Sequence, residues 1–349
     1  MHKPLLFDLT KQALLDFLAE HKQPKFRADQ ILNFAIQGKD FADMHTLPKA
    51  LRELLAEHFE AVGVKIYNSL QSKIDETEKF LFLLQDGNLV EGVLMKYHYG
   101  YTLCISTQVG CRMGCKFCAS TLDGCVRNLT GAEMLGEVIA ANTHLGNKGK
   151  VGHIVLMGSG EALDNYDNTI AFLRMVHRED LLNISYRNIS LSTCGLVPQI
   201  IRFMEEDIPL TLSISLHAPT NERRKEIMPI ANSYSLPELM GAARAYVQKT
   251  GRRVIFEYAV MEGINSAKED AETLAKLLKN LQCHVNVIPL NKVEERNLQA
   301  PKHSKINAFI ETLEALGVSV SKRRSMGTDI EGACGQLRNK TVTLLKSQE

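Results

Sequence analysis

Three cysteines stand close together in the chain, Cys111, Cys115 and Cys118, in the pattern C-x3-C-x2-C. Thiolates this near in sequence can hold one metal centre without the entropic cost of closing a long loop. A structural zinc ion takes four ligands, usually as paired Cys-x2-4-Cys motifs or with histidines at fixed spacing, and neither pattern follows here. An iron–sulfur cluster held by three cysteines leaves one iron open to another ligand. The spacing therefore predicts a metal centre, with Cys104 and Cys125 as the nearest further thiols.

Other polar residues follow short apolar runs, where a catalytic site is expected. Helical patterns separate six such runs, at 102–106, 152–157, 188–192, 210–216, 253–260 and 284–290. Alternation of nearly continuous apolar strands with helices predicts a buried parallel sheet. In such α/β folds, chemistry takes place at the carboxyl ends of the strands. Six units rather than eight favour an open, partial barrel.

The remaining elements frame this barrel. Before residue 60, three helices are expected: one capped by Thr10, one ending before Gly38 and one starting at Pro48. Asp86-Gly87 between two apolar runs predicts a hairpin, and the basic segment 318–324 is a candidate for a further strand. The expected domains are an N-terminal helical accessory domain, a β-hairpin extension, the barrel and a C-terminal tail, at 1–75, 76–100, 101–325 and 326–349.

The amino-acid composition argues against a membrane-spanning or secreted protein. The 349 residues are 45% hydrophobic and 23% charged, as in soluble globular proteins. No stretch approaches the ~18 apolar residues of a membrane span, and the start of the chain lacks the apolar region of a secretory signal. Eight cysteines without an export signal favour metal ligands, catalytic thiols or buried residues over disulfides, in a cytoplasmic protein. The net charge of +1 argues against a general polyanion coat, but residues 319–349 carry six basic and three acidic side chains, which favours local RNA contact.

The cysteine pattern resembles the radical S-adenosylmethionine (SAM) superfamily, in which this loop follows the first strand of a partial (βα)6 barrel. The resemblance implies that Cys111, Cys115 and Cys118 bind a [4Fe-4S] cluster, whose open iron binds SAM. Gly160 and Glu161 match the Gly-Glu pair that holds the methionyl part of SAM. A carboxylate that faces an ammonium group is physically sensible in that role.

A narrower resemblance, to the RNA methyltransferases RlmN and Cfr, covers nearly the whole chain. It rests on residues 90–91, 104–111, 160–163, 192–195, 215–219, 228–230 and 329–337, the last stretch being the most specific. It implies further SAM contacts at Ser192, Ser215, Leu216, His217 and Asn291. The family methylates a ring carbon of an adenosine in the peptidyl-transferase centre of 23S rRNA, C2 for RlmN and C8 for Cfr. RlmN also modifies the tRNA adenosine beside the anticodon.

The resemblance also implies a chemical role for three residues outside the cluster. Cys334 would take a methyl group from one SAM, and a radical made from a second SAM would then activate that group for addition to the electron-poor adenine ring. Cys104 would release the resulting protein–RNA adduct by forming a disulfide with Cys334. Glu91, a carboxylate within an apolar run, would accept the ring proton. Without the family, Cys334 and Cys104 would be interpreted as inert or core thiols.

Several alternatives remain at this stage. Ala162 stands where RlmN members usually have proline and Cfr has alanine, whereas the Gln108–Cys111 and Leu216–Pro219 motifs look like RlmN. We expect C2 methylation, with C8 methylation as the alternative. A radical SAM enzyme with an unrelated substrate, or a non-catalytic RNA-binding protein with a structural metal, are the other hypotheses. The expected partners are 23S rRNA, tRNA and an electron donor such as flavodoxin or ferredoxin, with no membrane, for a monomer.

Overall fold

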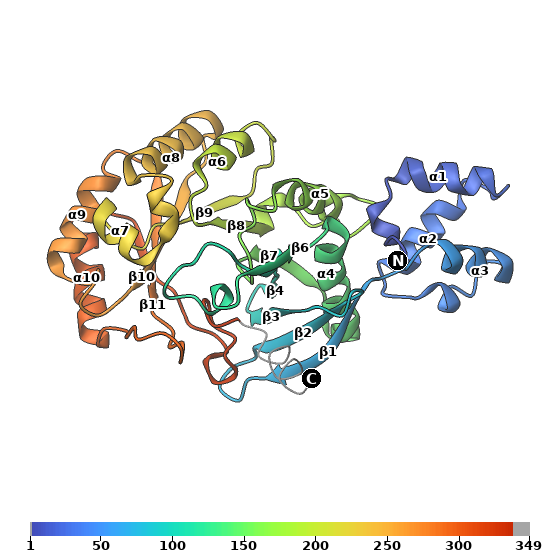
Figure 1. Ribbon diagram of the computed structural model, residues 1–349, viewed down its shortest axis with the longest axis horizontal. Coiled ribbons are helices and arrows are strands. Elements are labelled where there is room, and N and C mark those ends of the chain that lie inside the picture. Colours follow the sequence, from blue (N-terminus) through green and yellow to red (C-terminus); the bar gives the residue numbers. More distant parts are fainter. Residues whose placement is uncertain (1, 338–349) are drawn as a thin grey trace.

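A ten-stranded sheet forms the centre of the protein, in a computed structural model that describes residues 2–337 (Figure 1). The strands follow one another in the order β1-β2-β3-β4-β7-β8-β9-β10-β11-β12, with no pairing between the first and the last. Arg338, Lys340 and Lys346 of the predicted basic tail, and the end of the predicted 326–349 segment, lie outside the described residues.

All six predicted apolar runs are strands, and each is parallel to the next one along the chain. They are β4 (Gly100–Cys104), β7 (Val151–Leu156), β8 (Ile189–Thr193), β9 (Thr211–Ser215), β10 (Val254–Val260) and β11 (Cys283–Pro289). A short parallel strand, β12 (Val320–Lys322), follows within the predicted segment 318–324. The sheet curves without closing, so the predicted α/β fold with a partial barrel is confirmed.

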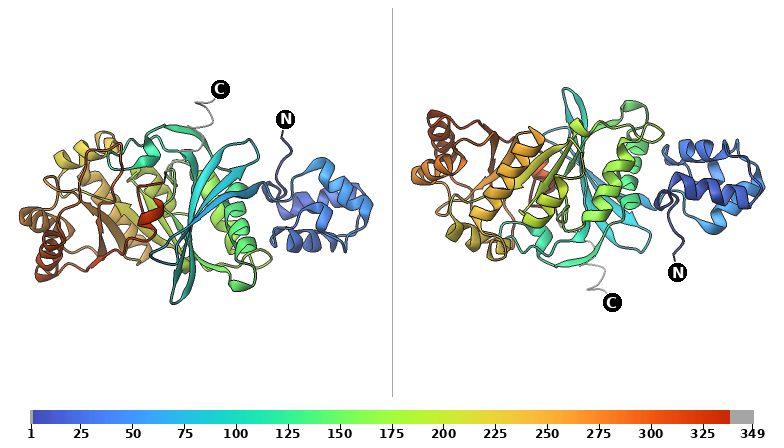
Figure 2. Two further views of the ribbon diagram at one scale, coloured as in Figure 1. Left: turned by 90° about the horizontal axis from the view of Figure 1, so that it is seen from below. Right: turned by 90° about the horizontal axis from the view of Figure 1, so that it is seen from above.

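Helices follow these strands and cover one side of the sheet, while the C-terminal segment lies on the other side (Figure 2). They are α4 (Gly131–Leu145), α5 (Tyr166–His177), α6 (Val197–Phe203), α7 (Asn221–Ile227), α8 (Leu236–Thr250), α9 (Lys268–Leu278) and α10 (His303–Ala315). Thr130 caps α4 and Ser235 caps α8, each in a reciprocal capping box with the glutamate three residues later. These caps determine the residue at which each helix starts, and so determine where the loop before that helix ends.

Three helices precede the sheet and stand apart from the barrel in Figure 1, as predicted. They are α1 (Lys11–Glu20), α2 (Arg27–Ala35) and α3 (Lys49–His58). The Thr10 hydroxyl accepts a hydrogen bond from the Ala13 amide at 3.1 Å, which confirms the predicted cap. Such a cap stabilises a helix by about 1 kcal/mol.

Three antiparallel strands, rather than two, lead into the barrel. The predicted hairpin is present as β2 (Glu78–Leu84) and β3 (Leu89–Tyr97), and β3 pairs with β4. One strand was not predicted. It is β1 (Val64–Gln71), which lies within the expected helical domain 1–75 and pairs with β2. Most β1 side chains are exposed, so this edge strand lacks the alternation of apolar and polar residues that marks a half-buried strand.

A separate two-stranded sheet was also missed. It consists of β5 (Gln108–Gly110) and β6 (Cys125–Asn128), one on each side of the three clustered cysteines. Short 3-10 helices complete the structure: η1 (Leu6–Asp8), η2 (Phe41–Asp43), η3 (Ala119–Thr121), η4 (Gly146–Lys148), η5 (Tyr186–Asn188), η6 (Pro229–Asn232) and η7 (Thr328–Ile330). Among the described residues, no helix has the length and hydrophobicity needed to cross a bilayer.

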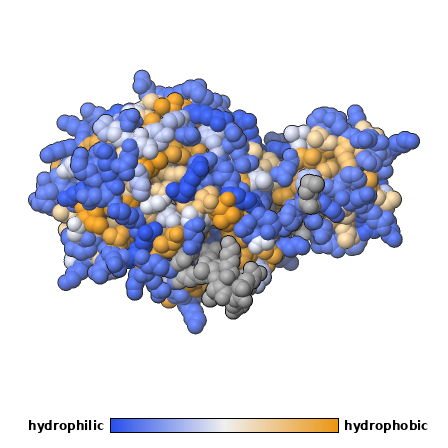
Figure 3. All heavy atoms as spheres, viewed as in Figure 1, coloured by the Kyte–Doolittle hydropathy of each residue, from blue (hydrophilic) through white to orange (hydrophobic). Residues whose placement is uncertain are grey.

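Two apolar clusters hold these elements together. The larger one joins the sheet, the covering helices and the N-terminal helices. The smaller one joins Val93, Met95 and Cys104 of the hairpin and first barrel strand to Met326 and Leu337 near the end of the described chain. The face in Figure 3 is mostly hydrophilic, with apolar areas between the charged side chains. The smaller cluster packs the last part of the described chain against the sheet.

Candidate active site

A cavity of about 160 Å³ lies at the carboxyl ends of the barrel strands. It brings together most of the residues that the sequence singled out: Cys111, Cys115, Cys118, Gly160, Glu161, Ser192, Ser215, His217, Asn291 and Cys334. Three predicted residues do not line it. Leu216 is fully buried in the core, and Cys104 and Glu91 lie elsewhere, as described below.

The loop with the three cysteines is held in place by its own flanking strands. The Cys111 amide donates a hydrogen bond to the Gly124 carbonyl at 2.8 Å, and β5 pairs with β6 around this point. Gly110 has a φ of +78°, and a Cβ there would lie 2.1 Å from the Gly124 carbonyl oxygen. Inside the loop, the Thr121 hydroxyl hydrogen-bonds to the carbonyls of Cys115 and Cys118 at 3.1 and 3.0 Å. Contacts within the loop and with its flanking strands therefore define its shape.

The chemistry of the three thiols suits an iron–sulfur cluster. No group of three His, Cys, Asp or Glu side chains in the described part of the chain is arranged around a single metal ion, yet all three thiols line one cavity. Burial raises the pKa of Cys111 to about 12 and raises the pKa values of Cys115 and Cys118 above their usual range. Thiolates in such a place need the positive charge of a metal centre. The donor set therefore fits a [4Fe-4S] cluster.

The Gly-Glu turn after β7 is built by close backbone contacts. Gly160 has a φ of +113°, and a Cβ there would lie 2.5 Å from the Thr107 hydroxyl oxygen. The Glu161 carboxylate is buried, and its oxygens accept hydrogen bonds from the amides of Cys194 at 2.6 Å and Leu163 at 3.1 Å. Burial raises the pKa of Glu161, and these hydrogen bonds oppose that rise. A buried carboxylate at the wall of a cavity can bind an ammonium group.

His217 is the predicted cofactor contact with the most constrained geometry. Its φ is +56°, and its Nδ1 accepts a hydrogen bond from the Ala259 amide at 2.9 Å. Burial, together with the Arg224 guanidinium, lowers the pKa of His217 to about 3. The ring is therefore neutral at physiological pH. Since Nδ1 accepts, the proton lies on Nε2, which leaves the ring one donor for a ligand.

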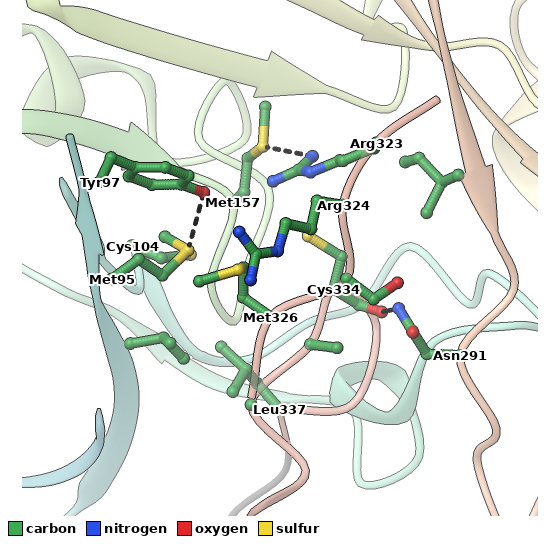
Figure 4. Close-up of a pocket in the computed structure, with 15 residues that line it drawn as sticks. Met95, Tyr97, Cys104, Met157, Asn291, Arg323, Arg324, Met326, Cys334 and Leu337 are labelled. Carbon is green, nitrogen blue, oxygen red and sulfur yellow. Dashed lines mark hydrogen bonds between the residues drawn. The ribbon is translucent and has the colours of Figure 1, made fainter. Parts of the chain in front are cut away.

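A second, smaller cavity of about 30 Å³ contains both Cys104 and Cys334 (Figure 4). Its walls include Val93, Met95 and Tyr97 of β3. Cys334 lines both cavities, as do four further residues: Met157, Ile288, Asn291 and Arg323. The structure thus places Cys334 between the three clustered cysteines and Cys104, although these thiols are far apart in the sequence.

Four hydrogen bonds hold the segment around Cys334 against the barrel. The Asn291 side-chain amide donates to the Cys334 carbonyl at 3.0 Å. The Ala119 amide donates to the Gly335 carbonyl, and the Ser120 hydroxyl donates to the Leu337 carbonyl, both at 2.7 Å. In the fourth hydrogen bond, the Gln336 side-chain amide donates to the Lys292 carbonyl at 2.9 Å. The cysteine loop and the residues after β11 therefore fix the position of the Cys334 backbone.

The charges around the two thiols come from Arg323 and Glu257. The guanidinium of Arg323 lies 3.6 Å from the Glu257 carboxylate, and the neighbouring Cys334 is the largest cause of the raised pKa of Arg323. Burial, and then Cys334, raise the pKa of Cys104. The Cys104 thiol is therefore protonated at physiological pH. All eight cysteines are free thiols in this structure, so the disulfide expected from the sequence is absent from this state.

Glu91 lies outside both cavities. Its carboxylate is buried and forms an ion pair with the Lys79 ammonium group at 3.0 Å. Glu91 shares a face of β3 with Val93 and Met95, which line the smaller cavity, because side chains alternate along a strand. The structure therefore places the predicted proton acceptor beside the cavity wall but not at the cavity.

Sequence reasoning missed Glu257, Arg323 and Met157, which line the larger cavity. Glu257 carries the same signal that singled out Glu91, a carboxylate within an apolar strand, and that signal could have found it. Burial raises the pKa of Glu257, and Arg323 and Asn286 oppose the rise. Met157 ends an ordinary apolar run, and Arg323 stands in a basic segment, so nothing in the sequence distinguishes them from core and surface residues.

Comparisons with known proteins agree with this site. Residues 105–278 match the radical SAM superfamily, and residues 5–61 match the ribosomal RNA large subunit methyltransferase N-terminal domain. A probable dual-specificity RNA methyltransferase RlmN of Clostridium botulinum (strain Eklund 17B / Type B) is 48% identical over 345 residues, covering 99% of this chain and 98% of the relative. The equivalent protein of Alkaliphilus oremlandii is 49% identical, covering 97% and 99%.

A solved structure extends the comparison to the fold. The crystal structure of a radical SAM methyltransferase from Sphaerobacter thermophilus superposes with a TM-score of 0.93 at 41% identity, covering 96% of this chain and 99% of the other. The relatives and this structure both match over nearly their full length, so the likeness includes the helical N-terminal region as well as the barrel. The chain therefore belongs to the RlmN family of radical SAM methyltransferases.

Proposed function

We propose that this protein methylates C2 of the 23S rRNA adenosine in the peptidyl-transferase centre and of the tRNA adenosine beside the anticodon. The observation that carries the proposal is the position of Cys334, which lines one cavity with Cys111, Cys115 and Cys118 and a second cavity with Cys104. A sulfur that carries one carbon between a cofactor and a base needs both neighbours. The relatives' names, dual-specificity RNA methyltransferase, support the substrate class.

The larger cavity is proposed to hold the [4Fe-4S] cluster and SAM. Cys111, Cys115 and Cys118 would bind the cluster. Glu161 would hold the ammonium group of SAM, and the neutral His217 would donate a hydrogen bond. Gly160, Ser192, Ser215 and Asn291, which line the same cavity, are further proposed contacts. When bound, the cluster supplies the electron that turns SAM into a source of a carbon radical.

Cys334 is proposed to carry the methyl group. Its thiolate attacks the methyl carbon of one SAM, so that a bond from this carbon to the Cys334 sulfur forms and the bond to the SAM sulfur breaks, releasing S-adenosylhomocysteine. One hydrogen atom passes from this S-methyl group to the 5′ carbon of a second SAM, which leaves as methionine and 5′-deoxyadenosine, and the carbon radical that remains adds to the adenine ring. Two SAM molecules are then used per turnover. Arg323, near Cys334, places a positive charge where the thiolate forms.

Release requires Cys104 and a base. In the proposal, the adduct radical would give one electron back to the iron–sulfur centre, and Glu91 would accept the ring proton. The Cys104 thiolate then attacks the Cys334 sulfur and forms a disulfide, and the carbon–sulfur bond breaks with its electron pair on the carbon, which takes up a proton to become the methyl group. Both thiols line the same small cavity, which supports this step. The Glu91 carboxylate forms an ion pair with the Lys79 ammonium group at 3.0 Å. We further propose that flavodoxin or ferredoxin supplies electrons to a cytoplasmic monomer.

The first prediction separates this function from its alternatives. Anaerobically purified protein is expected to contain iron and sulfide, and with SAM, reductant and 23S rRNA it should yield C2-methyladenosine by mass spectrometry. C8-methyladenosine would instead assign the Cfr type of reaction. A colourless protein with stoichiometric zinc and no product would favour a non-catalytic RNA-binding protein.

The second prediction concerns the two thiols outside the cluster. Cys104→Ala should accumulate a covalent protein–RNA adduct, because the adduct has no thiol to release it, and Cys104→Ala combined with Cys334→Ala should not. Cys283→Ala, which changes a thiol that lines neither cavity, is the matched control and should turn over without adduct. Normal turnover by Cys104→Ala without any adduct contradicts the proposed release step.

A further inference from the structure

Aromatic side chains gather at the turn between β3 and β4. The rings of Tyr97 and Tyr99 are stacked, with centroids 5.1 Å apart and planes inclined by 9°. The ring of His153, on β7, meets Tyr99 at 4.7 Å and 63°, and His98 meets it at 5.1 Å and 79°. Neither contact is needed to close a two-residue turn, because the pairing of Tyr97 with Gly100 already does so.

This aromatic stack connects the smaller cavity to solvent. Tyr97 lines the cavity that contains Cys104 and Cys334, and Figure 4 shows its ring beside Met95 and Met157. Tyr99 is 51% exposed, so its ring continues the stack beyond the cavity. A half-exposed tyrosine held rigidly by stacking offers a large apolar surface at low cost in conformational entropy.

A positive charge accompanies the stack. Arg324 lines the same cavity and is exposed. Within residues 2–337 its guanidinium forms no hydrogen bond or ion pair, whereas its neighbour Arg323 pairs with Glu257. Proteins that bind single-stranded nucleic acid combine such features: a base stacks on an aromatic ring, and a nearby guanidinium contacts a phosphate.

Flexible side chains form much of the wall of the smaller cavity. Three methionines line it, Met95, Met157 and Met326, and methionine side chains readily change shape. These side chains can therefore adapt to a base that enters the cavity, and contacts outside the cavity add to the binding of the RNA.

We propose that Tyr99 is the stacking surface for the unpaired nucleotide next to the target adenosine, with Arg324 at the adjoining phosphate. Stacking of this adjacent nucleotide on Tyr99 then stabilises the arrangement in which the target base has left its own stack and entered the cavity. This inference rests on the proposed function, because it takes RNA as the substrate. An aromatic ring can stack on any of the four bases, so this contact is compatible with two RNA substrates of different sequence.

The test compares RNA binding by three variants with the wild type. Tyr99→Ala removes the ring, Tyr99→Phe keeps the ring without the hydroxyl, and Tyr67→Ala removes an equally exposed tyrosine (55%) from β1 as a control. The probe is an RNA hairpin with the target adenosine in its loop and 2-aminopurine as the neighbouring nucleotide. Affinity is measured by anisotropy, stacking by 2-aminopurine fluorescence, and folding by thermal melting.

Tyr99→Ala should weaken RNA binding roughly 5- to 100-fold, the effect of one base stack, and should restore 2-aminopurine fluorescence. Tyr99→Phe should bind like the wild type. For Tyr99→Ala, KM for RNA should rise more than kcat falls. Arg324→Ala should reduce the dependence of affinity on salt by about one phosphate contact. Equal affinity of Tyr99→Ala and Tyr67→Ala, or no change in fluorescence, overturns the inference.

The two proposals fail in distinguishable ways. Binding and fluorescence are measured without SAM, so they do not depend on methyl transfer. Wild-type protein that binds the hairpin through Tyr99 but forms no methyladenosine contradicts the proposed reaction and leaves the stacking surface intact. Wild-type protein that methylates RNA while Tyr99→Ala binds normally contradicts the stacking surface alone.

Discussion

At the scale of single residues, buried charges and rings are what set this site apart from an ordinary barrel. The Lys79–Glu91 ion pair lies in the hairpin with side chains only 10% and 6% exposed. His217 is a buried, neutral imidazole at a positive φ. Both features cost stability unless their partners are in place. The effect of each feature on stability can therefore be tested by substituting single side chains.

The third prediction concerns Lys79. Lys79→Met leaves the Glu91 carboxylate buried without its ammonium partner, and breaking a buried pair in this way costs about 3–5 kcal/mol of unfolding free energy. Adding Glu91→Gln should recover most of this loss, because no charge then remains buried. Urea unfolding of the two variants and the wild type measures the difference. A single variant as stable as the double variant contradicts the ion pair.

The fourth prediction concerns the pH dependence caused by His217. Its pKa is about 3 in the folded protein and ordinary, about 6.5, in the unfolded chain. The unfolded state therefore binds more protons between these values, and stability falls as the pH drops below about 6.5. His217→Asn keeps an acceptor for the Ala259 amide and tolerates the positive φ. Relative to this variant, the wild type should lose stability between pH 7 and pH 5 in denaturant titrations.

At the scale of elements, the small β5–β6 sheet gives the cysteine loop its shape. Gly110 and Gly124 both have positive φ, +78° and +72°, but only a Cβ at Gly110 would meet the opposite backbone. Strands this short contribute little by themselves. Their position on both sides of Cys111, Cys115 and Cys118 is what matters, since it limits how far the three thiols can separate.

The fifth prediction uses this pair of glycines. Gly110→Ala should lower the iron and sulfide bound per chain, because the alanine forces β5 away from the Gly124 carbonyl. Gly124→Ala carries only the strain of its φ, about 1 kcal/mol, and should bind nearly as much iron. Iron and sulfide analysis after anaerobic reconstitution measures both variants. Equal loss in the two would show that backbone strain, and not the close contact, controls the loop.

At the scale of the whole molecule, the C-terminal segment links parts of the chain that are distant in sequence. The Asp329 carboxylate accepts hydrogen bonds from the Ser72 hydroxyl at 2.7 Å and the Lys73 amide at 2.8 Å, in the turn between β1 and β2. Farther along, Gly335 bonds to the cysteine loop and Cys334 to Asn291. The segment thus spans the antiparallel strands, the cluster loop and the last long barrel strand, and the position of Cys334 depends on all three.

Much of this architecture is determined by the sequence alone. The C-x3-C-x2-C loop, the six parallel strands and the Asp86-Gly87 hairpin are local patterns, and each depends on residues near one another in the chain. Local signals fail for β1, whose side chains are mostly exposed, and for β5 and β6, which are too short to show a period. The family resemblance adds roles for Cys104 and Cys334 that spacing cannot provide.

Only the tertiary structure decides which of these residues meet. Cys334 reaches the three clustered cysteines because Asn291, Ala119 and Ser120 bind its backbone segment, and Glu91 is paired with Lys79 beside the cavity rather than within it. Glu257 and Arg323 become site residues only through the register of β10, β11 and β12. The physical reason is that long-range contacts depend on how strands and loops pack together, whereas a sequence pattern reports only the preferences of neighbours along the chain.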